Sequence, residues 1–166
     1  MIFRAATLID IPRIIAIETL PEFRSFIGSW SQEQHRKTIS DPDARYLVTE
    51  HEGQLSGFAI LLGLQSEHHS IELKRIAVMS PGNGLGRKML SAIIEKAFEE
   101  YQAHKLWLDV FETNQRARHL YKICGLKEDG ILRDAVLRDG EYHSLVLMSL
   151  LESEYRDPRR TVSTPQ

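Results

Sequence analysis

Hydrophobic and polar residues recur with two different periods along this chain. Alternation at every second residue predicts strands, and apolar residues spaced by three or four positions predict helices. Strands are predicted at residues 1–6, 45–51, 55–64, 71–78, 104–111, 130–137 and 142–151. Helices are predicted from Asp10 to Pro21, over residues 31–39, from a glycine-rich loop at 81–86 to about Tyr101, and from Asn114 to Cys124.

The longest predicted helix has a single apolar face, which is typical of a helix packed on one side of a sheet. Its apolar residues are Met89, Leu90, Ile93, Ile94, Ala97, Phe98 and Tyr101. Three local features are also predicted: Pro21 ends the first helix, His35 is exposed on the second, and the polar tail from Ser153 is frayed.

The order of elements predicts an α/β domain with a mixed, mostly antiparallel central sheet of about seven strands. Helices are expected on both faces of that sheet. A chain of 166 residues is long enough for one compact domain, predicted at residues 1–152, followed by the polar tail at 153–166.

The composition of the chain argues against some classes of binding partner. Lys and Arg number 21 against 23 Asp and Glu, so the formal net charge of −2 offers no bulk attraction to nucleic acid or to anionic membranes. The single cysteine, Cys124, and the absence of a signal-peptide pattern predict a cytoplasmic protein. No metal is expected, because the adjacent His68 and His69 have no evident third ligand.

Three glycines, Gly82, Gly84 and Gly86, lie between a predicted strand and the start of the long helix. A helix N-terminus attracts anions, and glycine allows the backbone to approach a phosphate closely. Arg87 and Lys88 add positive charge, so the loop predicts a diphosphate site, with a plain tight turn as the alternative. The Walker and dinucleotide-binding spacings are both absent.

Two segments resemble the GNAT superfamily of N-acetyltransferases. Gly84 and Gly86 match the small positions of its Gln/Arg-x-x-Gly-x-Gly/Ala loop, although Pro81 replaces the usual Gln or Arg. Residues 114–126 (NQRARHLYKICGL) are similar to its Asn-x-x-Ala-x-x-Leu-Tyr-x-x-x-Gly-Phe pattern, with Leu126 in place of Phe. Residues 73–78 and 130–133 resemble the branch that holds ribosomal-protein alanine and spermidine acetyltransferases.

The resemblance implies a GNAT-like domain that uses acetyl-CoA as co-substrate. Main-chain amides of the glycine loop would hold the pyrophosphate, the strand at 71–78 would pair with pantetheine, and the 114–117 turn would also contact the cofactor. The implied residues are Gly84, Leu85, Gly86, Arg87, Ile76, Ala77, Val78, Asn114 and Ala117. Two structural alternatives stay open: the strand is simply buried in the sheet, and Asn114 only caps a helix.

The implied reaction moves an acetyl group to a primary amine by direct attack in a ternary complex. By resemblance Tyr121 would protonate the departing CoA thiolate; otherwise it is a packing residue. The amine needs a base or a water relay. Glu72 is the first candidate, against its alternative as a solvated residue at a strand start, and Asp109 and Glu112 are reserves.

The acceptor is expected to be a protein N-terminus, a polyamine, an amino-acid derivative or an aminoglycoside. Phe23, Phe26 and Trp30 either wall its pocket or pack in the core. Dimerisation through the exposed edge of the last hairpin stays open. The rival functions are a non-catalytic acyl-CoA-binding module and a doubly wound nucleotide-binding domain.

Overall fold

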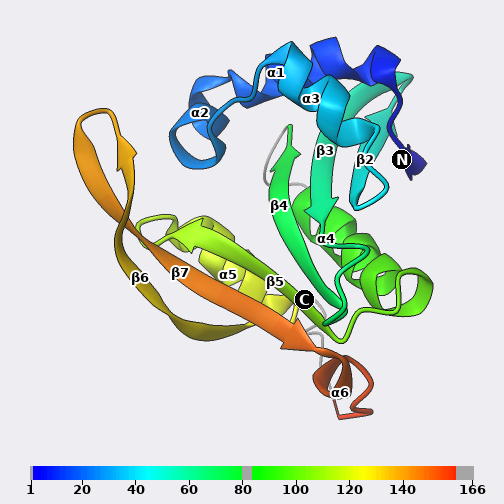
Figure 1. Ribbon diagram of the computed structural model, residues 1–166, viewed down its shortest axis with the longest axis vertical. Helices are drawn as coiled ribbons and strands as arrows, with labels where there is room; N and C mark the ends of the chain where they lie inside the picture. The colour runs from blue at the N-terminus through cyan, green and yellow to red at the C-terminus, as the bar shows by residue number, and fades with distance from the viewer. Residues whose placement is uncertain (1, 80–83, 160–166) are drawn as a thin grey trace.

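The computed structural model describes residues 2–79 and 84–159, which form one sheet covered by helices (Figure 1). The strands are β1 Ile2–Ala5, β2 Ala44–His51, β3 Gln54–Leu62, β4 Ser70–Val78, β5 Lys105–Phe111, β6 Lys127–Arg138 and β7 Glu141–Leu151. The helices are α1 Ile11–Glu18, α2 Pro21–Ile27, α3 Gln32–Ile39, α4 Leu85–Glu95, α5 Gln115–Ile123 and α6 Glu152–Tyr155. A 3-10 turn, Leu8–Asp10, precedes α1, and a π-helical turn, Lys96–Glu100, extends α4.

The seven strands lie in the order β1-β2-β3-β4-β5-β7-β6. Every neighbouring pair is antiparallel except β4 and β5, which are parallel. The predicted mixed, mostly antiparallel sheet is therefore confirmed. A sheet with one parallel pair is not the parallel sheet of a doubly wound nucleotide-binding domain.

Helices cover both faces of the sheet, as predicted (Figure 1). On one face, α4 and α5 bury the apolar stripe that begins at Met89 against β4, β5 and β7. On the other face, Ile14 and Ile17 of α1 pack against β2 and β3, beside Phe58.

Strand β4 contains a bulge at Lys74. Ile60 of β3 pairs with Arg75, but the next residue, Leu61, pairs with Leu73, so Lys74 is an extra residue in β4. A bulge bends its strand and reverses which side chains face each side of the sheet. Leu73 accordingly packs under α4, whereas Arg75 points to the face that α1 covers.

Two predictions about where regular secondary structure ends are wrong. Pro21 does not only end a helix: it is the first residue of α2, where its missing N–H and restricted φ are compatible with a helix start. The tail is not frayed at Ser153, because α6 forms there. The Tyr155 ring stacks on Phe98 with the centroids 4.7 Å apart.

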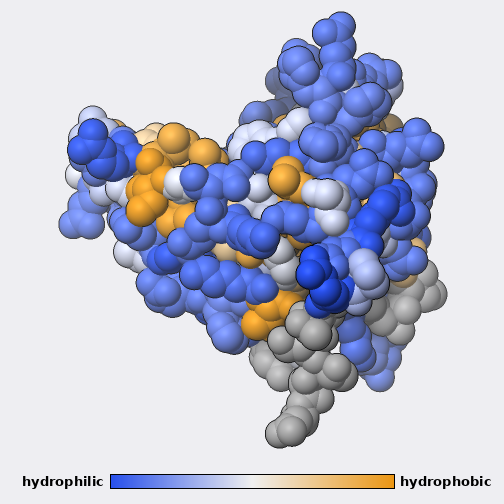
Figure 2. Space-filling model, turned by 90° about the horizontal axis from the view of Figure 1, so that it is seen from below, coloured by the Kyte–Doolittle hydropathy of each residue, from blue (hydrophilic) through white to orange (hydrophobic). Residues whose placement is uncertain are grey.

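The hairpin of β6 and β7 extends away from the body of the molecule (Figure 1). Apolar side chains gather on this side of the surface in Figure 2, and the exposed ones in β6 are Ile131, Leu132 and Leu137. Within the described ranges, no helix is long and apolar enough to cross a membrane.

Candidate active site

A cleft opens where β4 and β5 separate. The two strands pair only from Ser70 to Glu72 on β4 and from Lys105 to Trp107 on β5, and then they diverge (Figure 1). Beyond this point, the described strand pairings leave β4 without a partner on its β5 side. A cavity of about 190 Å³ lies at the split, next to the bulge at Lys74.

Four groups of side chains from six elements line this cleft. They are Phe26 and Ile27 of α2, Leu73 to Ile76 of β4, Asp109 and Phe111 of β5 with Tyr121 of α5, and Val136, Arg138 and Leu145 of the last hairpin. Of the predicted catalytic and cofactor-binding residues, the structure brings Tyr121 and Ile76 to the cleft.

Tyr121 reaches the cleft from α5, the helix whose pattern predicted it. Its side chain is buried, and burial raises the pKa of the phenol well above its usual range; the negative charge of Asp109 raises it further. The hydroxyl therefore keeps its proton at neutral pH and is available as a hydrogen-bond donor or a general acid.

The candidate bases occupy different positions. Asp109 lines the cleft with Tyr121. Glu72 lies before the split, in the short stretch where β4 and β5 still pair, and accepts a hydrogen bond of 3.0 Å from the Lys74 ammonium. Glu72 and Glu112 are both outside the set of residues that line the cleft.

The start of α4 has the features expected of an anion site. Gly84 precedes the helix with φ of 76°, a left-handed conformation that favours glycine. Among the described residues, a Cβ added at Gly86 would meet only Leu120 Cδ2, at an ordinary 3.6 Å, so packing against them does not require glycine there. The first turn contains no acidic residue. Residues 80–83, which include Pro81 and Gly82, lie outside the described residues.

The predicted pantetheine strand has its side chains on alternate faces. Ile76 and Val78 pack against the core under α4, and Ala77 against the core under α1. The expectation that the strand is buried in the sheet holds for its β3 side, where residues 75–78 are paired. On the β5 side, the same backbone segment borders the split. Its main-chain groups can therefore pair with an extended ligand, in the manner of an added strand.

Asn114 is the N-cap of α5. Its Oδ1 accepts a hydrogen bond of 3.2 Å from the backbone N–H of Ala117. The structural interpretation of this asparagine is thus confirmed, and contact of Asn114 or Ala117 with a cofactor stays a prediction.

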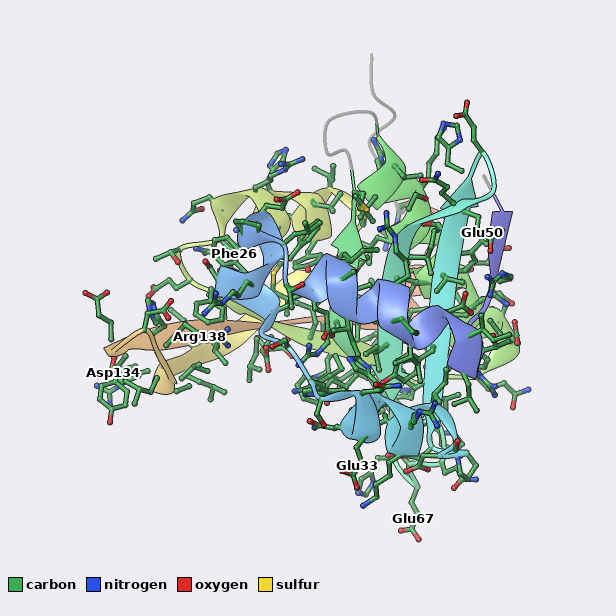
Figure 3. The ribbon with its side chains drawn as sticks, turned by 90° about the horizontal axis from the view of Figure 1, so that it is seen from above. Phe26, Glu33, Glu50, Glu67, Asp134 and Arg138 are labelled. Carbon is green, nitrogen blue, oxygen red and sulfur yellow. The ribbon has the colours of Figure 1, made fainter. Side chains whose placement is uncertain are left out.

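The outer wall of the cleft joins α2 to the last hairpin. The rings of Phe26 and Phe111 meet edge to face with centroids 6.0 Å apart. The Arg138 guanidinium lies 5.7 Å from the Phe111 ring, and its Nη1 donates to the backbone oxygen of Arg24 at 2.9 Å. Figure 3 shows Arg138 on the hairpin, next to the helix that bears Phe26. Of the three aromatic residues considered for the acceptor pocket, Phe26 lines the cleft, and Phe23 and Trp30 pack against the core under α1.

A buried polar cluster beside the cleft was missed from the sequence. Glu18 accepts hydrogen bonds from Arg75 Nη1 at 2.5 Å and from the backbone N–H of Trp30 at 3.2 Å. The Glu18 carboxylate is also 3.1 Å from His35 Nε2, and His35 Nδ1 is 3.0 Å from the Tyr46 hydroxyl.

The prediction that His35 is exposed is wrong: both His35 and Glu18 are fully buried. The available signal was the position of Glu18, one helical turn after Ile14 on the apolar stripe of α1. A carboxylate at such a position is buried with the helix and needs charged or hydrogen-bonding partners. In the described part of the chain, no group of three or more His, Cys, Asp or Glu could hold a metal ion.

Comparisons with known proteins show the family to which the chain belongs. The family model of the acetyltransferase (GNAT) family matches residues 12–126. The chain is 30% identical to spermidine N(1)-acetyltransferase of Vibrio cholerae over 126 residues, 75% of this chain and 73% of that protein. It is 28% identical to a putative [ribosomal protein bS18]-alanine N-acetyltransferase of Bacillus subtilis, over 83% of this chain and 88% of that protein.

A solved structure has the same fold. The crystal structure of spermidine N-acetyltransferase from Vibrio cholerae in complex with CoA and spermine superposes with a TM-score of 0.83 at 26% identity. The match covers 93% of this chain and 96% of that chain.

Proposed function

Because the chain belongs to the GNAT family and is an acetyl-CoA-dependent N-acetyltransferase, we propose that acetyl transfer takes place at the β4–β5 split. The observation that supports this location is the position of Tyr121, whose buried phenol lines the cleft where β4 and β5 part.

The chain's own groups would fit two parts of acetyl-CoA, its pyrophosphate and its pantetheine arm. The glycine-rich start of α4, residues 84–87, would hold the pyrophosphate through main-chain N–H groups. The β5-facing edge of β4 at residues 76–78 would hold pantetheine. Acetyl-CoA would supply the acetyl group as a thioester, and Ile76 and Tyr121 are the predicted residues that line the cleft where it would react.

Direct transfer requires the amine to be present together with the cofactor. Asp109 would take the proton that the amine loses as it attacks, because it is the cleft-lining carboxylate among the described residues. Backbone N–H groups of β4 would donate to the carbonyl oxygen as negative charge develops there. The Tyr121 hydroxyl would then protonate the departing thiolate.

Tyr121→Phe tests the location of the reaction. Removing the hydroxyl should lower kcat by about 10²- to 10⁴-fold, the usual contribution of a general acid, while the Kd for CoA stays within about twofold. CoA release would be followed with a thiol reagent, and CoA binding by calorimetry. Unchanged kcat would remove Tyr121 from the mechanism. A non-catalytic acyl-CoA-binding module would show no turnover in either form.

Asp109→Asn and Glu72→Gln together identify the base. Both variants remove one carboxylate and keep the size of the side chain. If Asp109 is the base, Asp109→Asn should abolish the low-pH limb of the kcat/KM profile and Glu72→Gln should leave it in place. The reverse result would assign the role to Glu72, and two unchanged profiles would indicate a water relay.

The family assignment does not identify the acceptor or the oligomeric state. The cleft supports a small primary amine, which would lie beside Phe26 and the last hairpin. A polyamine is the acceptor named for one relative and the α-amine of a ribosomal protein for another. A cytoplasmic location stays a prediction, as does a homodimer through β6, the edge strand with exposed Ile131 and Leu132. Light scattering of wild type and Leu132→Lys would test the dimer.

A further inference from the structure

The charged side chains that line the cleft are predominantly basic. Lys74, Arg75 and Arg138 line it, against one carboxylate, Asp109, among the described residues. Two of the three cations are neutralised locally: Lys74 pairs with Glu72 at 3.0 Å, and Arg75 with Glu18 at 2.5 Å. Within residues 2–79 and 84–159, Arg138 has no carboxylate partner.

Arg138 is held in place by neutral contacts. Its Nη1 donates to the Arg24 backbone oxygen, and its guanidinium lies over the edge of Phe111. A guanidinium has five N–H donors. The contacts in the described structure use few of them, so an anion in the cleft can still receive a paired hydrogen bond.

Arg75 supplies a second donor on the same lining. Its side chain is nearly fully buried, and its Nε–H has no hydrogen-bond partner among the described residues. A buried donor without a partner is unfavourable, because it has lost its hydrogen bond to water. An oxygen atom of a bound ligand would satisfy it.

We propose that the acceptor is a primary amine that also carries a carboxylate, with the amine at Asp109 and the carboxylate at Arg138. The inference rests on the proposed function, because it takes the β4–β5 cleft to be the acceptor site. A polyamine fits this lining poorly: each additional ammonium group would enter past Arg138 and find no second carboxylate on the described lining. The same chemistry is present in a free amino acid and in a peptide whose N-terminal residues include an acid.

Matched acceptors test this charge preference. L-alanine and γ-aminobutyrate would each be compared with the corresponding amide, which keeps the chain and loses the negative charge; spermidine would be a third class. A peptide pair beginning Ala-Asp or Ala-Asn separates a peptide acceptor from a free amino acid. For each acceptor, kcat/KM would be measured by CoA release for wild type and Arg138→Gln, so that the ratio cancels differences in amine basicity.

Arg138→Gln should lower kcat/KM for the preferred carboxylate by about tenfold or more, and for its amide by less than about threefold. Arg138→Lys keeps the charge but not the paired donors, and should recover part of the loss. Arg133→Gln, an exposed arginine on the same strand, is the matched control and should change neither. Stabilisation by CoA in a thermal-shift assay should be the same in all variants.

The proposal would be overturned if Arg138→Gln lowered kcat/KM equally for carboxylate acceptors and for their amides. Arg138 would then act only by holding the hairpin against α2. Faster wild-type turnover of every amide, or of spermidine, would also overturn it and leave the acetyltransferase reaction at this cleft intact. If Tyr121→Phe and Asp109→Asn leave turnover of these acceptors unchanged, the location of the reaction fails, and the acceptor assignment fails with it.

Discussion

The α4–α5 face of the sheet carries a cluster of buried apolar side chains with Tyr121, whereas on the α1–α3 face Glu18, His35 and Arg75 are buried beside apolar neighbours. Apolar packing tolerates small shifts of position, because dispersion contacts have no fixed direction. A buried ion pair depends on geometry, because each charge that loses its partner remains desolvated.

The difference matters for function because each face supports one half of the site. The apolar face carries α4 and α5, which present the glycine-rich helix start and Tyr121. The polar face fixes Arg75 on the cleft and, through Arg75 Nη1 and the Gly28 backbone oxygen at 3.1 Å, the end of α2. We therefore expect substitutions on the polar face to affect the acceptor more than the cofactor.

The largest effect on stability is expected from Glu18→Ala. It leaves Arg75 charged, buried and without its carboxylate, which should lower the free energy of unfolding by about 3–5 kcal/mol. Urea denaturation would measure the loss. The paired replacement Glu18→Leu with Arg75→Met removes both charges and should restore much of the stability. If it does not, packing or the contacts of Glu18 with Trp30 and His35 contribute more than the charge pair.

Leu90→Ala is the counterpart on the apolar face. Leu90 of α4 is fully buried against the sheet, so the cavity should cost roughly 2–5 kcal/mol. Because this face is apolar, KM for the acceptor should change little in the variant that remains folded. If Leu90→Ala changed the KM for the acceptor more than Glu18→Ala does, the division of roles between the two faces would be contradicted.

Gly86→Ala separates ligand binding from stability. The protein has room for the methyl group, and alanine favours helix, so stability should stay the same or rise by up to about 1 kcal/mol. Because the family pattern has glycine or alanine at this position, the methyl group should weaken CoA binding by no more than about threefold. Gly86→Asp, which places a negative charge in the first turn, should weaken it by about tenfold or more, or at least about 1.4 kcal/mol. Gly130→Ala, where an added Cβ meets nothing within 4 Å among the described residues, is the control for calorimetry. Unchanged CoA affinity in Gly86→Asp would argue against the phosphate cradle.

The smallest effect is expected at the start of α1, where the side chain of Asp10 pairs with Arg4 at 2.9 Å. The hydrogen bond from Arg4 lowers the pKa of Asp10 below its ordinary 3.8, despite partial burial. The stabilisation that ionised Asp10 contributes is therefore complete at pH values above its ordinary pKa, and it disappears as the pH falls through the lowered pKa. Because Arg4 is partly exposed, Asp10→Asn should cost less than about 1 kcal/mol at pH 7.

Denaturation of wild type and Asp10→Asn at pH 7, 4 and 2.5 would follow this contribution. The difference between the two proteins should shrink toward the lowest pH. Asp139→Asn, in the exposed turn between β6 and β7, should match wild type throughout. A constant difference for Asp10→Asn would mean that the side chain acts through its cap on Thr7, and not through its charge.

The sequence by itself predicted most of the elements and indicated which residues would hold the cofactor. Periodicity located the strands and the main helices, and glycine and asparagine signals located the start of α4 and the cap of α5, because these features depend on neighbours within one or two turns. The motif from Asn114 to Tyr121, through which the chain resembles the family, could also be recognised in the sequence, because its residues lie close together along the chain. Helix α2 was missed because its seven residues have too few turns to show a period.

Only the tertiary structure decided which of these residues meet. The split between β4 and β5 lies next to a bulge at Lys74 that no pattern marks, and Asp109, and not Glu72, lines the cleft there. Glu18 and Arg75 are 57 positions apart, and Arg138 reaches a backbone oxygen 114 positions away. Such contacts depend on how whole elements pack, and local preferences along the chain do not encode them.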